Sequence, residues 1–226
     1  MKSWIRQNRN FLVFLLLFGL FRTAIADWNP IPSGSMRPNL LEGDVVFVNR
    51  LAYNVKIPLT DTVLARTADP QRGDVVTFSS PLDGVRLIKR LVAVPGDVVE
   101  MRAKALIING QAARYEALDS VLEPAGPVGV LVATHVQETA PPGAPAAPHQ
   151  IQWLTGVAAK DNWGPMTIPP DQFLMLGDNR DNSADSRYIG LVPRQLLIGR
   201  AERILVSADI LEKWQPRFER FGRSLY

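Results

Sequence analysis

The sequence predicts a mainly β protein: an antiparallel β-sheet domain with a smaller Pro/Gly-rich β lobe, preceded by one N-terminal transmembrane helix. Short runs rich in Val, Ile, Leu and Phe recur along the chain, bounded by Gly-Asp, Pro-Gly-Asp or Asn-Gly turn signals. These runs do not alternate with long helical patterns, which disfavours a parallel α/β architecture. A largely uncharged apolar stretch lies close to the N-terminus. The 226 residues are enough for one domain with a smaller lobe.

The N-terminal segment predicts a membrane anchor. Residues 1–10 carry three basic residues and no acid, and residues 11–26 are apolar except for Arg22 and Thr23. As a helix, these 16 residues span roughly 24 Å, somewhat less than a hydrocarbon core of ~30 Å. Arg22 can reach the far headgroups, which makes a short single span feasible. We expect a cytoplasmic leader at 1–10, an anchor at 11–26 and an exported domain at 27–226.

A cleavable signal peptide is the alternative for this segment. It would combine the basic start, the apolar run from Phe11 to Phe21 and the A-x-A site "AIA" at 24–26. Arg22 is poorly placed for such processing, so an uncleaved anchor is favoured. In both cases the body of the protein is exported.

The expected strands lie in the exported body. Residues 119–165 are rich in Pro, Ala and Gly, so we expect loops around a strand or two there, within a smaller inserted lobe at about 100–170. The tail after residue 207 mixes aromatic residues with arginines and is expected to lie on a membrane surface or to form a short terminal helix packed on the domain. The predicted strands fall within 43–50, 73–80, 85–94, 97–103, 105–110, 173–178 and 200–207.

Composition excludes several kinds of chemistry. The chain has no Cys, so it has no thiol nucleophile, disulfide framework or Cys-based metal site. Its two histidines, His135 and His149, lie in the Pro/Ala/Gly-rich region, which argues against a His-based triad or a metal cluster. The net charge of +3 comes from scattered basic residues, so nucleic-acid binding has little support. We expect no metal and no cofactor.

The stretch "IPSGSMRPNL", residues 31–40, is the first candidate site. It places Ser33 and Ser35 on either side of Gly34, between Pro32 and Pro38. We expect Gly34 to allow a sharp backbone turn and the prolines to stiffen its flanks. A serine pair in such a loop usually only forms a turn, so its interpretation depends on the rest of the chain.

The second candidate is Lys89 in "DGVRLIKRLVAVPGD". Burial on an apolar face destabilises an ammonium and lowers its pKa. A lysine that is largely neutral near pH 8 must lose about 2 to 3 pKa units, which costs ~3 to 4 kcal/mol. Such an amine can take the proton of a serine hydroxyl, so no histidine is needed. In strand alternation, one face carries Val85, Leu87, Lys89 and Leu91, and the other carries Arg86, Ile88 and Arg90.

The third candidate is "GDNRDNSADSRYIG", residues 177–190, directly after a predicted strand. So many reciprocal charges in one segment indicate a buried hydrogen-bonded scaffold. Asp178 and Asp185 are the expected partners of Arg187. Ser183 is expected to hold the rotamer of the lysine.

These stretches resemble the bacterial type I signal peptidases (leader peptidases), membrane-anchored Ser–Lys endopeptidases. "PSGSMRPNLLEGD", "RGDVVTF", "IKRLVAVPGD" and "GDNRDNSADSRYIG" are each similar to one of the family's boxes, and they occur in the family's order. With the anchor, they span residues 11 to about 200. The resemblance implies the signal-peptidase-like fold, with an antiparallel β-sheet catalytic domain, and it departs from the best-known enterobacterial form in having one span and no Cys.

The resemblance implies a role for each matching residue. Ser35 matches the nucleophile and Lys89 the general base, while Ser33 and the backbone N–H of Ser35 match the oxyanion hole. Ser183 matches the hydroxyl that orients the lysine. Asp185 and Arg187 match a structural ion pair under the site, to which Asp178 adds support. The substrate cleft is expected at Ile31, Pro32, Met36, Leu40, Val46, Leu87 and Ile88.

The resemblance also implies a function and a location. The chain would cleave N-terminal signal peptides from exported preproteins after small-x-small motifs. It would act at the bacterial inner membrane, near the protein-export translocon, with its N-terminus in the cytoplasm and its catalytic domain on the outer side. Its partners would be preprotein signal peptides and the lipid bilayer, and no nucleic acid.

Two alternatives remain open. A peptidase specialised for one substrate, such as a conjugation pilin, would share the fold and the dyad. A non-catalytic anchored β-domain that acts as a binding or assembly factor would be expected to have lost Ser35 or Lys89, and the sequence has both.

Overall fold

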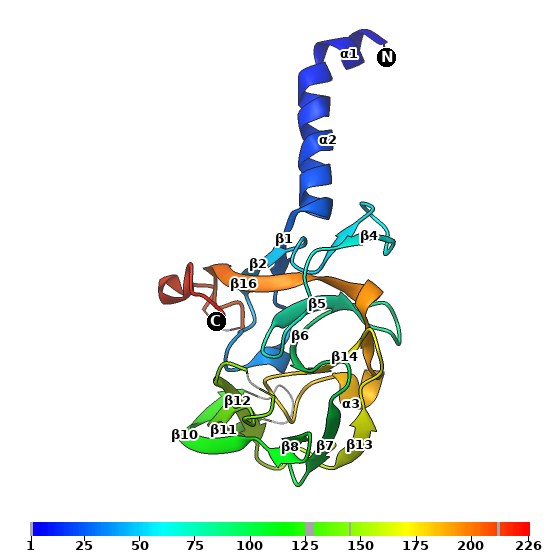
Figure 1. Ribbon diagram of the computed structural model, residues 1–226. Coiled ribbons are helices and arrows are strands. Elements are labelled where there is room, and N and C mark those ends of the chain that lie inside the picture. The colour runs from blue at the N-terminus through cyan, green and yellow to red at the C-terminus, as the bar shows by residue number, and fades with distance from the viewer. Residues whose placement is uncertain (1, 125–128, 145, 212) are drawn as a thin grey trace.

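The computed structural model describes the backbone of residues 2–124, 129–144, 146–211 and 213–226. Its β body carries an N-terminal helix that projects away from it (Figure 1). Helix α1 (Lys2–Gln7) is followed by α2 (Arg9–Ala24), a helix of 16 residues with no buried side chain. Every pairing between named strands is antiparallel, which confirms the predicted mainly β, antiparallel class.

The expected transmembrane anchor at 11–26 is not supported by the structure. Within the described part of the chain, no helix combines the length and the apolar character needed to cross a membrane. The physical reason is visible in α2, which begins at Arg9 and contains Arg22 in its last turn. At ~1.5 Å per residue, its length is roughly 24 Å, against a hydrocarbon core of ~30 Å.

A seven-stranded sheet forms the larger part of the body. β6 lies between β5 and β14, and β16 joins the β1–β2 pair to the rest of the sheet. The strands in spatial order are β1 (Ala26–Pro30), β2 (Asp44–Asn49), β16 (Leu197–Ser207), β5 (Val75–Ser79), β6 (Arg86–Ala93), β14 (Gln172–Leu176) and β15 (Val192–Pro193). A separate hairpin of β3 (Asn54–Lys56) and β4 (Val63–Arg66) lies near the base of α2 (Figure 1).

Two smaller sheets lie at the end of the body away from α2 (Figure 1). One contains β13 (Trp163–Thr167), β7 (Val98–Arg102), β8 (Ala105–Ile108) and β9 (Gln111–Ala112). The other contains β10 (Arg114–Pro124), β11 (Val130–Thr139) and β12 (His149–Leu154). These strands occupy most of the range 98–167, close to the lobe expected at about 100–170.

The region 119–165 contains more strand than predicted. We expected loops around a strand or two, but the end of β10, all of β11 and β12 and the start of β13 lie there. The β-branched run in "VLVATHVQET" outweighs the Pro, Ala and Gly around it, because it pairs with a strand on each side. Of the predicted loop "EPAGPVGV", residues 125–128 lie outside the described residues, as does Pro145 in "APPGAPAAPHQ".

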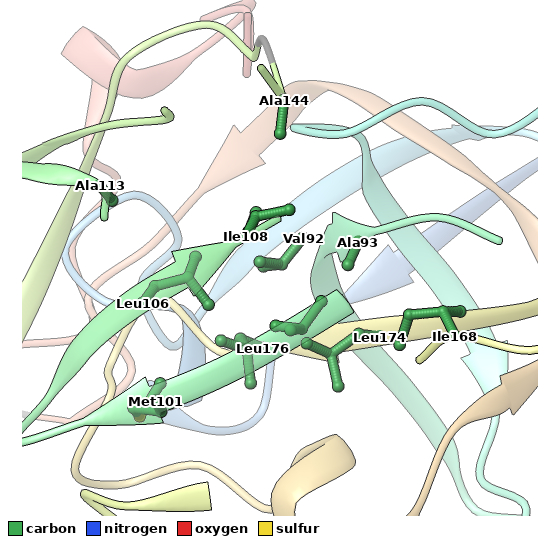
Figure 2. Close-up of a cluster of buried hydrophobic side chains, with 11 residues drawn as sticks. Val92, Ala93, Met101, Leu106, Ile108, Ala113, Ala144, Ile168, Leu174 and Leu176 are labelled. Atoms are coloured by element: carbon green, nitrogen blue, oxygen red, sulfur yellow. The ribbon is translucent and has the colours of Figure 1, made fainter. Parts of the chain in front are cut away.

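Buried apolar side chains divide into clusters on different strands. The cluster in Figure 2 joins β6 and β14 to the first small sheet, with Val92, Met101, Ile108 and Leu176 among its members. A second cluster lies under residues 31–48, and a third contains Leu91, Phe78 and Met175. β6 contributes to all of them, so its position is fixed by packing from several sides.

The C-terminal tail packs on the domain with little helix. In its described residues it forms the 3₁₀ turn η4 (Phe218–Arg220) and not the short terminal helix that was one of the two expectations. Arg220 is buried and binds the carboxylate of Asp44 with two hydrogen bonds of 3.0 and 2.6 Å. Leu225 packs against the cluster under residues 31–48, so the tail supports that part of the sheet.

A buried ion pair joins the larger sheet to the β10–β11–β12 sheet. Arg180, after β14, donates two hydrogen bonds of 2.6 Å to Glu138 on β11, and both side chains are 3% exposed. Gln152 on β12 also exchanges backbone hydrogen bonds with this segment, from its N–H to Asp178 and from Arg180 to its carbonyl. Burial alone would raise the pKa of Glu138, but Arg180 and His149 outweigh it and hold that pKa well below its ordinary value.

Glu138→Gln should therefore destabilise the fold strongly, because it leaves the Arg180 guanidinium buried without its counter-charge. We expect a loss of about 3 to 5 kcal/mol in the free energy of unfolding, measured by urea denaturation at pH 7. The wild-type advantage should shrink as the pH falls below the ordinary carboxyl range. The stability that a depressed folded-state pKa contributes is full above the unfolded-state pKa and is lost as the pH falls toward the folded-state pKa.

Asp171→Asn is the matched control. Asp171 pairs with Arg66 at 2.7 Å, but both side chains are more than half exposed, so its loss should cost about 0 to 1 kcal/mol. Equal losses in the two variants would contradict a structural role for the buried pair.

Candidate active site

The S-G-S loop lies directly before β2 and is held to it by backbone hydrogen bonds. The N–H of Ile31 donates to Asp44 at 2.8 Å, and the N–H of Gly43 donates to Ile31 at 2.9 Å. Gly34–Met36 forms a 3₁₀ turn, η1, and the side chain of Met36 is fully buried beneath it. The loop is thus fixed by the apolar packing of Met36, while Ser35 is only half-buried.

Gly34 is needed for space more than for backbone freedom. Its φ is not in the left-handed region, so the 3₁₀ turn at Gly34–Met36 does not require the backbone freedom of glycine. A Cβ on Gly34 would lie 3.0 Å from both Nε of Arg37 and Oε1 of Glu42. Glycine therefore lets the Arg37 side chain fold back over the loop.

Lys89 lies on β6 opposite Val76 of β5, and its side chain reaches the S-G-S loop. Its Nζ lies 2.5 Å from Oγ of Ser35, and the residue is 2% exposed. Burial lowers the pKa of Lys89 to about 8, while the carboxylates of Asp185 and Asp178 act in the opposite direction. The predicted strand face of Val85, Leu87, Lys89 and Leu91 is only partly present. Leu87 and Leu91 share one cluster, but Val85 precedes β6 and is exposed.

The polar segment 177–190 is largely buried, and two of its carboxylates bind guanidinium groups. Asp185 receives two hydrogen bonds of 2.8 Å from Arg187, and both side chains are almost fully buried. Asp178 does not bind Arg187, which corrects that part of the prediction. It receives hydrogen bonds of 2.8 and 2.7 Å from Arg90, because Arg90 is on the neighbouring strand and its head lies beside the end of β14.

The same segment holds the S-G-S loop by its backbone. The N–H of Asn179 donates to the carbonyl of Ser35 at 3.1 Å, and its side-chain amide donates to the carbonyl of Gly34 at 3.0 Å. Gly177 leaves room for this approach, since a Cβ there would collide with the Ser183 side chain and the carbonyl of Ser35. Ser183 therefore lies on the same side of Gly177 as the loop, and its Oγ is buried without a hydrogen-bond partner among the described residues.

The other predicted site residues are either exposed or packed in a core cluster. Ser33 is exposed and extended, with φ −140° and ψ 154°. Ile31, Met36, Leu40 and Val46 form one core cluster with Ile88 packed against it, so the first four can form only the floor of a cleft. Pro32 is exposed, and Leu87 packs into a different cluster. Among the described residues, no group of three or more acidic or histidine side chains is arranged to hold a metal ion.

The geometry fits the class of serine hydrolases in which an amine takes the place of the histidine base. A match to the family model described as "Signal peptidase, peptidase S26" covers residues 1–206. The chain belongs to this signal peptidase family and is a serine endopeptidase.

Named relatives show how far the similarity extends. A signal peptidase I of Pseudomonas aeruginosa is 34% identical over 231 residues, which cover 96% of this chain and 78% of that protein. A signal peptidase I of Pseudomonas fluorescens is 33% identical with the same coverage. A crystal structure of a signal peptidase I from Enterococcus faecalis is 27% identical, covers 59% of this chain and 97% of that one, and has a TM-score of 0.35.

Sequence reasoning missed three residues beside the site. Arg90, which binds Asp178, was placed only on the face opposite Lys89. Asn179, which holds the S-G-S loop, was counted only as one polar residue of its segment. Arg37 was not considered, although it lies two residues after Ser35. The available signal was the position of Asn179 directly after Gly-Asp at a strand end, where side chains commonly bind neighbouring backbone.

The lowered pKa of Lys89 can be tested without any assay of activity. We expect the Lys89 amine to titrate with a midpoint of about 8 by ¹⁵N NMR in selectively labelled protein. In Lys89→Met, folding no longer requires a buried amine, so the variant should be more stable than wild type at pH 7, by about 3 kcal/mol for a shift of this size.

The sign of the pH dependence follows from the direction of the shift. Between about pH 8 and pH 10.5 the unfolded chain binds the Lys89 proton and the folded chain does not, so wild-type stability rises with pH there. The advantage of Lys89→Met should therefore disappear above that window. A midpoint above 10, or an advantage that is constant with pH, would contradict the buried neutral amine.

Proposed function

We propose that the protein removes N-terminal signal peptides from exported preproteins, with Ser35 as nucleophile and Lys89 as general base. The observation that carries this proposal is the contact of 2.5 Å between Nζ of Lys89 and Oγ of Ser35, made by an amine with a pKa of about 8. Such an amine is substantially unprotonated at mildly alkaline pH. It can therefore accept the Ser35 hydroxyl proton directly across the existing hydrogen bond.

In the first half of the proposed reaction, Oγ of Ser35 attacks the scissile carbonyl while Nζ of Lys89 takes the hydroxyl proton. The new C–O bond converts the carbonyl oxygen to an oxyanion, for which the backbone N–H of Ser35 and the hydroxyl of Ser33 are the proposed donors. The C–N bond then breaks, and the Lys89 ammonium gives its proton to the leaving amine. The signal peptide remains as an ester on Ser35.

In the second half, water attacks the ester carbonyl and Lys89 takes a proton from it. The intermediate releases the signal peptide as a carboxylic acid, and the proton on Lys89 returns to Oγ of Ser35. Because the base must act twice, its orientation has to persist through both steps. Ser183 is the proposed orienting group, and it is supported by its buried and unpartnered Oγ, among the described residues, on the loop's side of Gly177.

We place this activity at the bacterial inner membrane, on its outer side and near the translocon, where preproteins emerge. The support is the basic start of the chain followed by an α2 whose apolar side chains are exposed along its length. Such a surface is stabilised by contact with lipid acyl chains or interfacial headgroups.

Ser35→Ala and Lys89→Ala should each abolish cleavage of a model preprotein while leaving the fold intact. The two groups act as a unit, so each single variant should lower kcat by more than about a thousandfold and the double variant by little more. Wild-type kcat/KM should rise with pH along a limb near the Lys89 midpoint of about 8. A folded single variant that keeps more than about a thousandth of wild-type kcat would refute the dyad.

Substrates should require small side chains at the last and third-last positions before the cleaved bond. An extended peptide added as a strand turns both side chains toward the same surface. The floor beneath the site is already filled by Met36, Leu40 and Val46, so a larger group must displace packed atoms at about 1 to 3 kcal/mol. Cleavage rates with Ala, Val and Phe at the third-last position test this. Equal rates with Phe and Ala would show that the pockets are not shallow.

A further inference from the structure

Arg37 lies two residues after Ser35 and bridges two carboxylates. Its Nε donates to Oε2 of Glu42 at 2.9 Å, and its Nη1 lies 3.0 Å from Oε2 of Glu123. All three side chains are largely buried, at 13%, 13% and 16% exposed. Charge-assisted hydrogen bonds of this kind are strong and directional, so the guanidinium has little freedom.

The two carboxylates come from different parts of the molecule. Glu42 is in the turn that leads from the S-G-S loop into β2, and Glu123 is close to the end of β10 in the β10–β11 hairpin. Glu123 also accepts a hydrogen bond of 3.1 Å from the side-chain amide of Gln152 on β12. Arg37 therefore links the loop that carries Ser35 to the smaller three-stranded sheet.

The Arg37 side chain also lies against the backbone of the loop. A Cβ on Gly34 would be 3.0 Å from its Nε, and the N–H of Arg37 donates to the carbonyl of Gly34 at 3.1 Å. On its other side the loop is held by Asn179, which binds the carbonyls of Gly34 and Ser35. A cavity of about 70 Å³ is lined by Gly34, Arg37, Glu42 and Asn179 and, from the hairpin, by Glu123 and Leu131.

Without the Arg37 guanidinium, the S-G-S loop and the β10–β11 hairpin would tend to separate. Glu42 and Glu123 would face each other without a counter-charge in a poorly solvated space, and like charges there repel. The hairpin and the loop would then move apart. Because the S-G-S loop covers part of Lys89, this movement would let water reach the amine.

We propose that Arg37 is a positioning residue that keeps Ser35 against Lys89 by tying the S-G-S loop to the β10–β11 hairpin through Glu42 and Glu123. The proposal rests on the proposed function of Ser35 and Lys89. It makes the smaller sheet part of the apparatus that sets the nucleophile in place, although the sheet supplies no reacting atom.

The test compares Arg37→Met, Arg37→Lys, Glu123→Gln and the double variant Arg37→Met/Glu123→Gln. Arg102→Met is the matched control, because Arg102 pairs with Glu100 at 2.8 Å on β7 of another sheet and is 71% exposed. For each protein, kcat and KM for a model preprotein are measured from mildly acidic to strongly alkaline pH, together with the thermal midpoint. Wild type and Ser35→Ala are measured first, and an inactive wild type would refute the proposed function itself.

We expect Arg37→Met to lower kcat by about 10- to 100-fold with KM changed less than about threefold. The limb along which activity rises with pH should move to higher pH, because hydration of Lys89 raises its pKa. Glu123→Gln should lower kcat less, and Arg37→Lys should recover part of the loss, because an ammonium keeps the charge but not the two-armed geometry. The double variant should lose no more than Arg37→Met, since both changes break the same link and Glu123→Gln also removes the repulsion between the two carboxylates.

An active wild type with Glu123→Gln indistinguishable from Arg102→Met would overturn the proposal. So would additive losses in the double variant, or a pH limb that stays in place. Should Arg37→Met fail to fold, Glu123→Gln and Arg37→Lys still decide the question, because each stays close to the volume of the original side chain.

Discussion

The structure depends on the burial of one amine. Lys89 is placed in the interior of a strand where its charge is poorly solvated, and its contact with Ser35 can serve the proposed chemistry only while the amine stays easy to deprotonate. A neighbouring free carboxylate would remove that property by pairing with the amine. Asp178 and Asp185 both lie close enough to raise the pKa of Lys89, yet each is bound by two hydrogen bonds to a guanidinium, Arg90 and Arg187. The arginines thus keep the carboxylates occupied, and the amine is left with the hydroxyl.

This requirement explains why so much charge is buried around the site. The segment after β14 contains aspartates and arginines that are largely inaccessible to water, and its backbone also holds the S-G-S loop through Asn179. Buried ion pairs contribute less to stability than well-packed apolar groups of the same volume. Their use here is consistent with positioning, because each two-bonded pair fixes the direction of a strand end or a loop. The larger and smaller sheets meet through such a pair, Arg180 with Glu138.

Much of this could be predicted from the sequence, and particular residues show why. The strands at 44–49, 75–79 and 86–93 follow from β-branched runs between Gly-Asp turns, which are local signals. The proximity of Ser35 and Lys89 came from resemblance, since nothing local brings together residues 54 positions apart. The partner of Asp178 was mistaken because choosing between Arg90 and Arg187 requires the register of β6 against β14. β11 was underestimated because its β-branched run lies among Pro and Gly, and a short membrane span was expected at 11–26 because Arg22 can reach the far headgroups.

The order of the strands has a consequence for how the protein is made. β16, residues 197–207, lies between β2 and β5, so the strand pairing of the large sheet passes from one part to the other through a strand near the end of the chain. Ser35 belongs to the part with β2, and Lys89 to the part with β5. During synthesis, everything before β16 can leave the ribosome without the strand that connects the two parts, and such long-range pairing is slow to form. We therefore expect the proposed nucleophile and base to meet late, once β16 has been translated, so that a chain still lacking β16 has no assembled copy of the proposed site.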